Sequence, residues 1–213
     1  MVLDIGRKKS LKIGIFGGTF DPIHLGHLIV AEEARVLLDL DQVIFIPAGR
    51  PWFKSRQQVT DVKHRLAMVE CATASNPHFS VSKIETTRSG PTYTVETLEE
   101  LRERYFPEDR LFLIIGVDSL REVDRWQHPE QLFEMATLVG VARPGHEEFD
   151  PASLESIAPG ASDKVVMLDG PLVEISATDL RHRVATGVSI RYRVPEPVEA
   201  YIREHGLYLS EHG

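Results

Sequence analysis

The sequence has very little cysteine, since Cys71 is the only one among 213 residues. A single thiol closes no disulfide within the chain and builds no zinc site alone, and such scarcity is typical of a reducing compartment. Cys71 falls in a stretch with helical spacing. That position favours a small buried residue over a reactive thiol.

Long apolar runs are also absent. No segment reaches the roughly 18 consecutive apolar residues that a membrane-spanning helix needs. Residues 11–16 are apolar and follow Arg7, Lys8 and Lys9, but they run into two glycines too soon for a signal peptide. We therefore expect a cytoplasmic protein with no membrane partner.

Basic residues are in the minority. Lys and Arg total 24 against 32 Asp and Glu, a formal net charge of −8. An acidic surface repels polyanions, which argues against a non-specific nucleic-acid partner. A small anion can still bind where positive groups gather. Hydrophobic residues make up 42% and charged residues 26%, close to the globular average, so a disordered chain, a collagen and a coiled coil are excluded.

Short apolar runs alternate with helix-like stretches. We expect strands at residues 11–16, 42–47, 111–117, 137–142 and 165–168, and helices at residues 25–38, 61–74, 94–105, 176–185 and 197–204. This alternation predicts an α/β fold with a doubly wound, mainly parallel, Rossmann-like sheet and helices on both faces. The length favours one domain over residues 1–213, with a core at about 12–208 and the last helix packed on it. Such sheets bind ligands beyond the carboxyl ends of their strands.

The stretch richest in chemistry joins the first strand to the first helix. Residues 14–27 read Gly-Ile-Phe-Gly-Gly-Thr-Phe-Asp-Pro-Ile-His-Leu-Gly-His. Gly17 and Gly18 allow the backbone to approach a ligand closely, and the helix start presents free N–H groups to an anion. His24 and His27 lie on one side of that turn and can donate hydrogen bonds to phosphate. Their spacing also suits two ligands of one metal ion, but no Cys or His-Glu motif nearby completes a zinc set.

Three common motifs are missing. The chain contains no Gly-x-x-x-x-Gly-Lys-Ser/Thr, no Gly-x-Gly-x-x-Gly and no Gly-x-Ser-x-Gly. These absences argue against a P-loop kinase, a dinucleotide-binding dehydrogenase and a serine hydrolase.

A second polar stretch lies near the end of the chain. Residues 175–181 read Ile-Ser-Ala-Thr-Asp-Leu-Arg, in which Ser176 and Asp179 resemble a capping box. A cap still leaves other N–H groups open, beside the Thr178 hydroxyl and the Arg181 guanidinium. This combination suits a polyphosphate.

The two stretches together resemble the hallmarks of the nucleotidyltransferase superfamily with a His-x-Gly-His element. Within it, the chain resembles the bacterial nicotinate-nucleotide adenylyltransferases. Three further stretches carry this resemblance: Gly-Pro-Thr-Tyr-Thr-Val-Glu-Thr-Leu at residues 90–98, Ile-Gly-Val-Asp at 115–118 followed by Trp126, and Tyr-Ile-Arg-Glu-His-Gly-Leu-Tyr at 201–208. The resemblance covers residues 12–208.

The resemblance implies an enzyme of NAD biosynthesis that moves AMP from ATP to nicotinate mononucleotide, giving deamido-NAD and pyrophosphate. Mg²⁺ would arrive on the ATP phosphates, so no protein metal ligands are expected. Transfer of this kind needs alignment and charge neutralisation more than covalent help. The partners would be these two small molecules, and a homo-oligomer is compatible with the resemblance.

Residue roles also follow from the resemblance. Thr86 would offer an amide to the nicotinate carboxylate, and Trp126 would stack on the pyridine ring, although it also fits a partly buried core position. Arg143 would reach a phosphate, although it also fits an ordinary surface position. The implied catalytic residues are His24, His27, Lys54 and Arg181; the ATP-binding residues are Gly17, Gly18, Thr19, Phe20, Ser176, Thr178 and Arg181; and the substrate-binding residues are Thr86, Gly116, Asp118, Trp126 and Arg143, with Gly116 and Asp118 at a ribose.

One loop departs from the family pattern, and three other functions stay open. The family often has Pro-Pro-His-Lys after the second strand, but here Phe53 precedes Lys54, which leaves the part this loop plays open. Phosphopantetheine adenylyltransferases share both hallmarks but are typically shorter. Nicotinamide mononucleotide is an alternative acceptor. A nucleotide-sensing protein without catalysis is the non-enzymatic alternative, although it would not need both histidines, Lys54 and Arg181.

Overall fold

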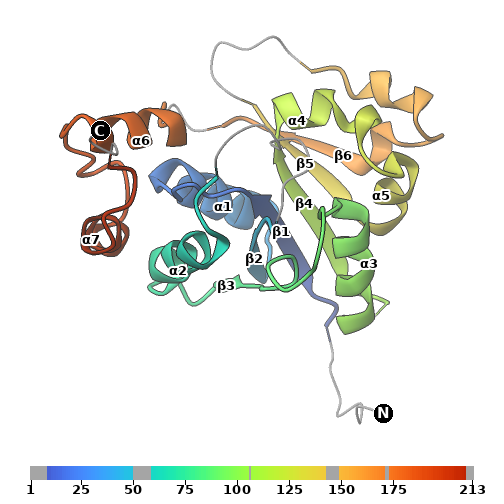
Figure 1. Cartoon of the computed structure of the whole chain (residues 1–213). Helices are drawn as coiled ribbons and strands as arrows, with labels where there is room; N and C mark the ends of the chain where they lie inside the picture. Colours follow the sequence, from blue (N-terminus) through green and yellow to red (C-terminus); the bar gives the residue numbers. More distant parts are fainter. Residues whose placement is uncertain (1–8, 50–58, 106, 143–148, 171–172, 210–213) are drawn as a thin grey trace.

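The computed structural model describes residues 9–49, 59–105, 107–142, 149–170 and 173–209. Within them the chain forms a six-stranded sheet of order β3-β2-β1-β4-β5-β6 (Figure 1). All neighbouring strands are parallel, which confirms the predicted fold class. The strands are β1 (Lys12–Gly18), β2 (Gln42–Pro47), β3 (Phe79–Val81), β4 (Arg110–Gly116), β5 (Thr137–Val141) and β6 (Val165–Leu168).

Helices cover both faces of the sheet (Figure 1). On one face lie α1 (Leu25–Leu37), α2 (Val62–Thr73), α6 (Ala177–Ala185) and α7 (Glu196–Glu204), and on the other lie α3 (Thr94–Arg104), α4 (Val117–Arg121) and α5 (Pro129–Met135). Short 3₁₀ turns occur at η2 (Val123–Arg125), η3 (Pro151–Ser156) and η4 (Ser162–Lys164). No helix in these described ranges is both long and apolar enough to cross a bilayer.

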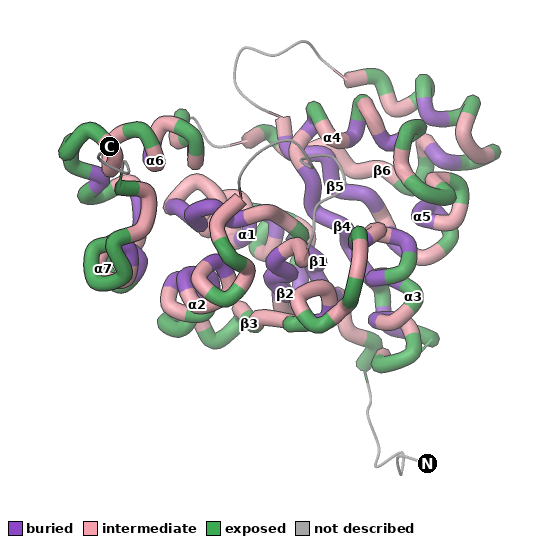
Figure 2. The backbone as a smooth tube through the Cα atoms, viewed as in Figure 1, coloured by how far each residue is buried: buried purple, intermediate pink, exposed green. Residues whose placement is uncertain are grey.

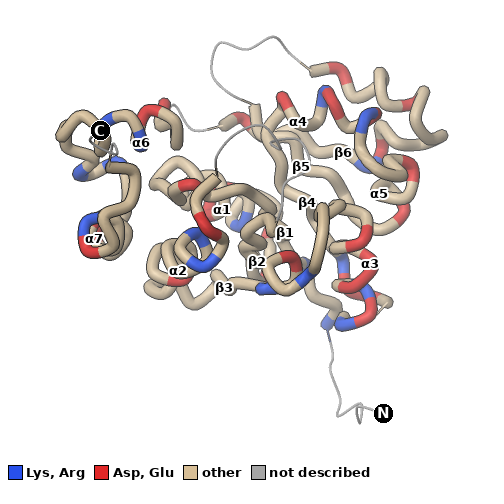
Figure 3. The backbone as a smooth tube through the Cα atoms, viewed as in Figure 1, with Lys and Arg blue, Asp and Glu red and all other residues tan. Residues whose placement is uncertain are grey.

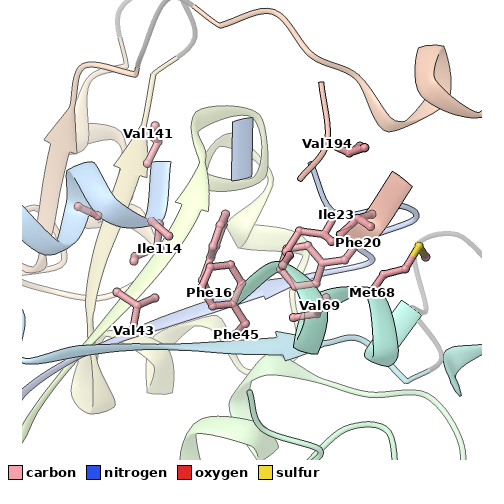
Figure 4. Close-up of a cluster of buried hydrophobic side chains, with 14 of the residues drawn as sticks. Phe16, Phe20, Ile23, Val43, Phe45, Met68, Val69, Ile114, Val141 and Val194 are labelled. Carbon is pink, nitrogen blue, oxygen red and sulfur yellow. The ribbon is translucent and has the colours of Figure 1, made fainter. Parts of the chain in front are cut away.

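Each central strand contributes side chains to two apolar clusters. In β1, Ile13 and Ile15 belong to the cluster beneath α3–α5, whereas Phe16 belongs to the cluster beneath α1, α2 and α7. Alternation follows from the strand repeat of two. Figure 2 shows the burial concentrated in these strands, and Figure 4 shows Phe16 and Phe45 within the second cluster. Strands buried on both faces read as continuous apolar runs, which is why the sequence revealed them.

Charged residues lie mainly on the outer helices and turns, as Figure 3 shows, while the central strands are almost free of them. The last helix, α7, packs on the core, since Val198 and Ile202 are buried in the cluster beneath α1, α2 and α7. Cys71 is half-buried against the same cluster.

The topology fixes where a ligand can bind. The chain passes from β1 through β2 to β3 on one side, then returns to β4 on the other side of β1. This reversal opens a crevice at the carboxyl ends of β1 and β4. Phe16 pairs with Ile114 in the parallel register, so Gly17 and Gly116 reach the same edge of the sheet.

Some elements differ from the sequence prediction. The strand β3 and the helices α4 and α5 were not expected. For α2, helical spacing predicts an inner face of Val62, Leu66, Val69 and Thr73. Val69 and Thr73 are buried as predicted, whereas Val62 and Leu66 are only half-buried. Arg65 and Met68 are buried as well, so the inner face is shifted relative to the prediction and includes a charged residue.

Candidate active site

A cavity of about 760 Å³ lies at the carboxyl edge of the sheet. It is bounded by the turn after β1, the start of α1, the ends of β4 and β5, and the start of α6. Both polar stretches singled out in the sequence therefore line one space. The predicted residues that line it are Gly17, Gly18, Thr19, Phe20, His24, His27, Gly116, Asp118, Ser176, Thr178 and Arg181.

The two histidines form one rigid unit at the start of α1. His24 is the N-cap residue and is buried. The two imidazole rings stack with centroids 3.7 Å apart, and the His24 backbone N–H donates to His27 Nδ1 at 3.2 Å. Since Nδ1 accepts, the proton of the neutral His27 ring lies on Nε2. The Phe20 ring meets His27 edge-on at 5.1 Å, so the His27 donor is held in place.

The helix start is less open than predicted. The Leu25 N–H donates to the Arg193 carbonyl at 3.0 Å, and the His27 N–H donates to the His24 carbonyl at 3.0 Å. The expectation of free amides is wrong for these two residues. These two amides are therefore not open to an anion.

Two glycines open the backbone to the cavity. A Cβ added at Gly17 or at Gly116 would meet nothing within 4 Å. At Gly18 it would lie 2.8 Å from the Phe20 ring, so that glycine is needed for packing. Phe20 itself has a φ of 50°, which is unfavourable for a residue with a side chain.

The start of α6 completes the opposite wall. Ser176 accepts the Asp179 N–H at 3.4 Å, as the capping prediction requires, but the Asp179 carboxylate pairs with Arg183 at 2.8 Å. Arg181 Nη1 donates to the Asp21 carbonyl at 2.7 Å, and its Nη2 donates to Thr178 Oγ1 at 3.3 Å. The two sequence motifs are thus in direct contact across the cavity.

The carboxylate of Asp21 is buried beside this contact. It accepts the Thr60 N–H at 3.1 Å and the Tyr208 hydroxyl at 2.7 Å. Burial, together with the Asp21 charge, raises the pKa of Tyr208. The hydroxyl therefore stays protonated and remains a donor to Asp21.

Two predicted residues, Thr86 and Trp126, do not line the cavity, and a third, Asp118, lines it only at its exposed rim. The Thr86 N–H, expected to serve a carboxylate, donates to the Lys83 carbonyl at 3.0 Å, and Thr86 is not part of the lining. Trp126 is half-buried against the cluster beneath α3–α5, which matches the alternative prediction of a partly buried core position. Asp118 is exposed at the rim, 3.8 Å from Arg121.

Two predicted residues, Lys54 and Arg143, lie outside the described residues, as does Phe53. Within the described ranges, no group of three or more His, Cys, Asp or Glu side chains is placed to hold a metal ion.

Sequence reasoning assigned no function to Asp21, Arg65 or Tyr208. Arg65 is 1% exposed and binds the carbonyl of Thr19 in the cavity wall at 2.8 Å. Its spacing from Met68 and Val69, which are also buried, is the signal that would have placed it on the inner face of α2.

Comparisons with known proteins agree with this geometry. The family model for cytidylyltransferase-like proteins matches residues 15–183. A probable nicotinate-nucleotide adenylyltransferase of Thermomicrobium roseum is 47% identical over 199 residues, covering 93% of this chain and 92% of that protein. A protein of the same name from Leifsonia xyli is 44% identical, covering 98% of this chain and 99% of its own length.

A solved structure has the same fold. It is the nicotinic acid mononucleotide adenylyltransferase of Plasmodium falciparum complexed with NaAD, with a TM-score of 0.76 and 20% identity. The match covers 93% of this chain and 98% of that one.

Proposed function

Because the chain belongs to the nicotinate-nucleotide adenylyltransferases of the cytidylyltransferase-like family, we propose that its cavity transfers AMP from ATP to nicotinate mononucleotide in NAD biosynthesis. An oxygen of the mononucleotide 5′-phosphate attacks the α-phosphorus of ATP. The bond between the α-phosphorus and the bridging oxygen breaks, and pyrophosphate leaves with the electron pair. The other product is deamido-NAD.

The observation that carries this proposal is that the two motifs line one cavity. They are joined directly by the hydrogen bond from Arg181 to the Asp21 carbonyl at 2.7 Å. Two of the five guanidinium N–H groups are engaged with Asp21 and Thr178. Those bonds fix the plane of the fork, and the other N–H groups suit phosphate oxygens. His27 Nε2 adds a fixed donor across the cavity.

This arrangement favours catalysis by alignment and charge stabilisation. Donors held in place before the reaction lose little order as negative charge develops on the phosphates. Mg²⁺ would be held by the ATP phosphates and would neutralise part of their charge. The open backbone at Gly17 and Gly116 admits a nucleotide against the strand ends. Lys54 and Arg143, which lie outside the described residues, are proposed to bind phosphate oxygens as well. We assign the reaction to the cytoplasm.

We further propose that the acceptor is nicotinate rather than nicotinamide mononucleotide. A site that donates to both oxygens of a carboxylate leaves one donor unpaired when an amide binds. An unpaired buried donor costs about 1–3 kcal/mol. That energy corresponds to about one to two decades in kcat/KM.

Pyrophosphate release measured with ATP and each candidate acceptor tests the proposal. We expect turnover with nicotinate mononucleotide, a kcat/KM at least about tenfold lower with nicotinamide mononucleotide, and none with phosphopantetheine. Equal values for the two mononucleotides would refute only the acceptor preference. Binding of ATP without turnover of any acceptor would favour the nucleotide-sensing alternative.

A further inference from the structure

Among the residues that the structure describes, Arg65 is the largest fully buried side chain, and it is only 1% exposed. Its guanidinium donates four hydrogen bonds, all to main-chain carbonyls. Nε donates to Thr60 at 2.8 Å, Nη1 to Thr19 and to Ala48 at 2.8 Å each, and Nη2 to Gly49 at 3.1 Å. Four of the five N–H groups available to an arginine are thus used on the backbone. Lysine has neither the reach nor the planar geometry to replace them.

The four carbonyls come from three separate segments. Thr19 belongs to the turn after β1 that lines the cavity, Ala48 and Gly49 follow β2, and Thr60 precedes α2. One side chain therefore ties the cavity wall to both neighbouring segments.

The bond to Thr19 constrains the next residue. The Thr19 carbonyl and the Phe20 N–H share one planar trans peptide, so fixing the carbonyl on Arg65 turns the Phe20 N–H the opposite way. Phe20 also has a φ of 50°, and such conformations persist only where the surroundings impose them. Phe20 in turn packs edge-on against His27 at 5.1 Å. The hydrogen bond from Arg65 to Thr19 thus helps to position His27, the proposed phosphate donor, through Phe20.

Asp21 completes the network on the other side. Its carboxylate accepts from Tyr208 at 2.7 Å and from the Thr60 N–H at 3.1 Å, while its carbonyl accepts from Arg181 at 2.7 Å. Thr60 is therefore held by its N–H through Asp21 and by its carbonyl through Arg65. Burial lowers the pKa of Arg65, and the nearby Asp21 charge offsets part of that effect.

We propose that Arg65 is a positioning residue of the transfer reaction, which sets the Thr19–Asp21 turn so that His27 and Arg181 meet the ATP phosphates, with Tyr208 in support. The inference rests on the proposed function. It distinguishes Arg65 from a purely structural arginine, which would change stability alone.

Arg102 on α3 is a matched control. Its guanidinium also holds main-chain carbonyls, with Nε donating to Met135 at 3.1 Å and Nη1 to Asp109 at 2.6 Å, and burial also lowers its pKa. It lies on the opposite face of the sheet and is not part of the cavity lining. Arg65→Lys and Arg102→Lys remove the same kind of bonds from two places.

The test compares steady-state kinetics of the two variants with those of the unaltered enzyme, at a temperature where circular dichroism shows all three folded. Misplacing reacting groups by about 1 Å can cost about 10²-fold. We therefore expect Arg65→Lys to lower kcat/KM for ATP by about 10- to 100-fold. Arg102→Lys should lower the melting temperature and leave kcat and both KM values unchanged. Arg65→Lys with unaltered kinetics would overturn the inference.

A second pair of variants tests the same inference if Arg65→Lys fails to fold. Tyr208→Phe removes only the hydroxyl bound to Asp21, and Tyr201→Phe removes a hydroxyl bound to His64 at 3.0 Å. We expect a lower kcat/KM for ATP in the first and unaltered kinetics in the second. Unaltered kinetics in both would overturn the inference. An unaltered enzyme that shows no turnover would instead refute the proposed function.

Discussion

Replacing His27 by asparagine isolates one donor of the cavity. His27 Nδ1 accepts the His24 N–H at 3.2 Å, and asparagine Oδ1 can accept the same bond from the same helical position. Asparagine, however, places no donor where Nε2 lies. Glutamine reaches farther, and its amide N–H₂ falls near the Nε2 position. The two substitutions therefore separate the cap from the donor.

The expected loss is catalytic rather than structural. Removing one preorganised donor costs about 10²–10³ in kcat. His27 also contacts three rings, with centroids at 3.7 Å for His24, 5.1 Å for Phe20 and 6.1 Å for Phe16. At about 0.5–1.5 kcal/mol for each aromatic pair, their loss costs about 1.5–4.5 kcal/mol of stability. That is below the roughly 5–15 kcal/mol of a typical domain, so unfolding would not account for a hundredfold loss.

The assay is pyrophosphate release with both substrates saturating, beside a calorimetric melting temperature. His205→Asn is the matched control, because the His205 ring also stacks on a neighbour, Tyr201, at 4.0 Å, but it lies at the end of α7. We expect kcat to fall about 10²-fold or more in His27→Asn, less in His27→Gln, and not in the control. A kcat within about threefold of the unaltered enzyme for His27→Asn would refute the reasoning.

Three further substitutions test other parts of the site and fold. Gly116→Ala adds a Cβ that meets nothing within 4 Å, so calorimetry should show an unchanged or higher melting temperature while substrate KM rises; an unchanged KM would show that no ligand approaches there. Arg181→Ala should raise the KM for ATP, and Arg181→Lys should recover little because the fork that reaches Asp21 and Thr178 is lost; ATP titrations that match the unaltered enzyme would contradict this. Burial raises the pKa of Glu85, so its contribution to stability falls as pH rises from the ordinary glutamate pKa toward the raised one. Thermal unfolding across that range should show the fall in the unaltered protein but not in Glu85→Gln, and parallel curves would argue against it.

The elements that sequence reasoning located are those with a strong local signal. Four strands, β1, β2, β4 and β5, were readable because burial on both faces makes them continuous apolar runs. The fifth, β6, is a half-buried edge strand and gave a weaker apolar signal. The strand β3 spans only Phe79–Val81 at the sheet edge, too short for a repeat to show. The helix α4 begins directly where β4 ends, with no loop between them. The start of α5 carried one usable signal, a proline at the first helical position.

The site residues also differ in whether the local sequence signals their position. His24, His27 and Arg181 were predictable because they lie within motifs at a helix start. Arg65 was not, because an arginine in a helix is ordinarily exposed, and its burial depends on carbonyls from three segments that only the fold brings together. The Thr86 amide donates to the Lys83 carbonyl at 3.0 Å, a bond that the sequence did not reveal, and its assignment to the nicotinate carboxylate stays a prediction.

The bond from Tyr208 to Asp21 spans 187 positions of the chain, and this has a consequence for biosynthesis. A ribosome adds about 5–20 residues per second, so roughly 10–40 s pass between the synthesis of Asp21 and that of its partner. Throughout that time the Thr19–Asp21 turn of the nascent chain lacks the bond from the Tyr208 hydroxyl. For most of that time it also lacks the bond from Arg181. Competence to bind ATP would therefore arise only after Tyr208 has been synthesised, which keeps a shorter nascent chain from sequestering the nucleotide.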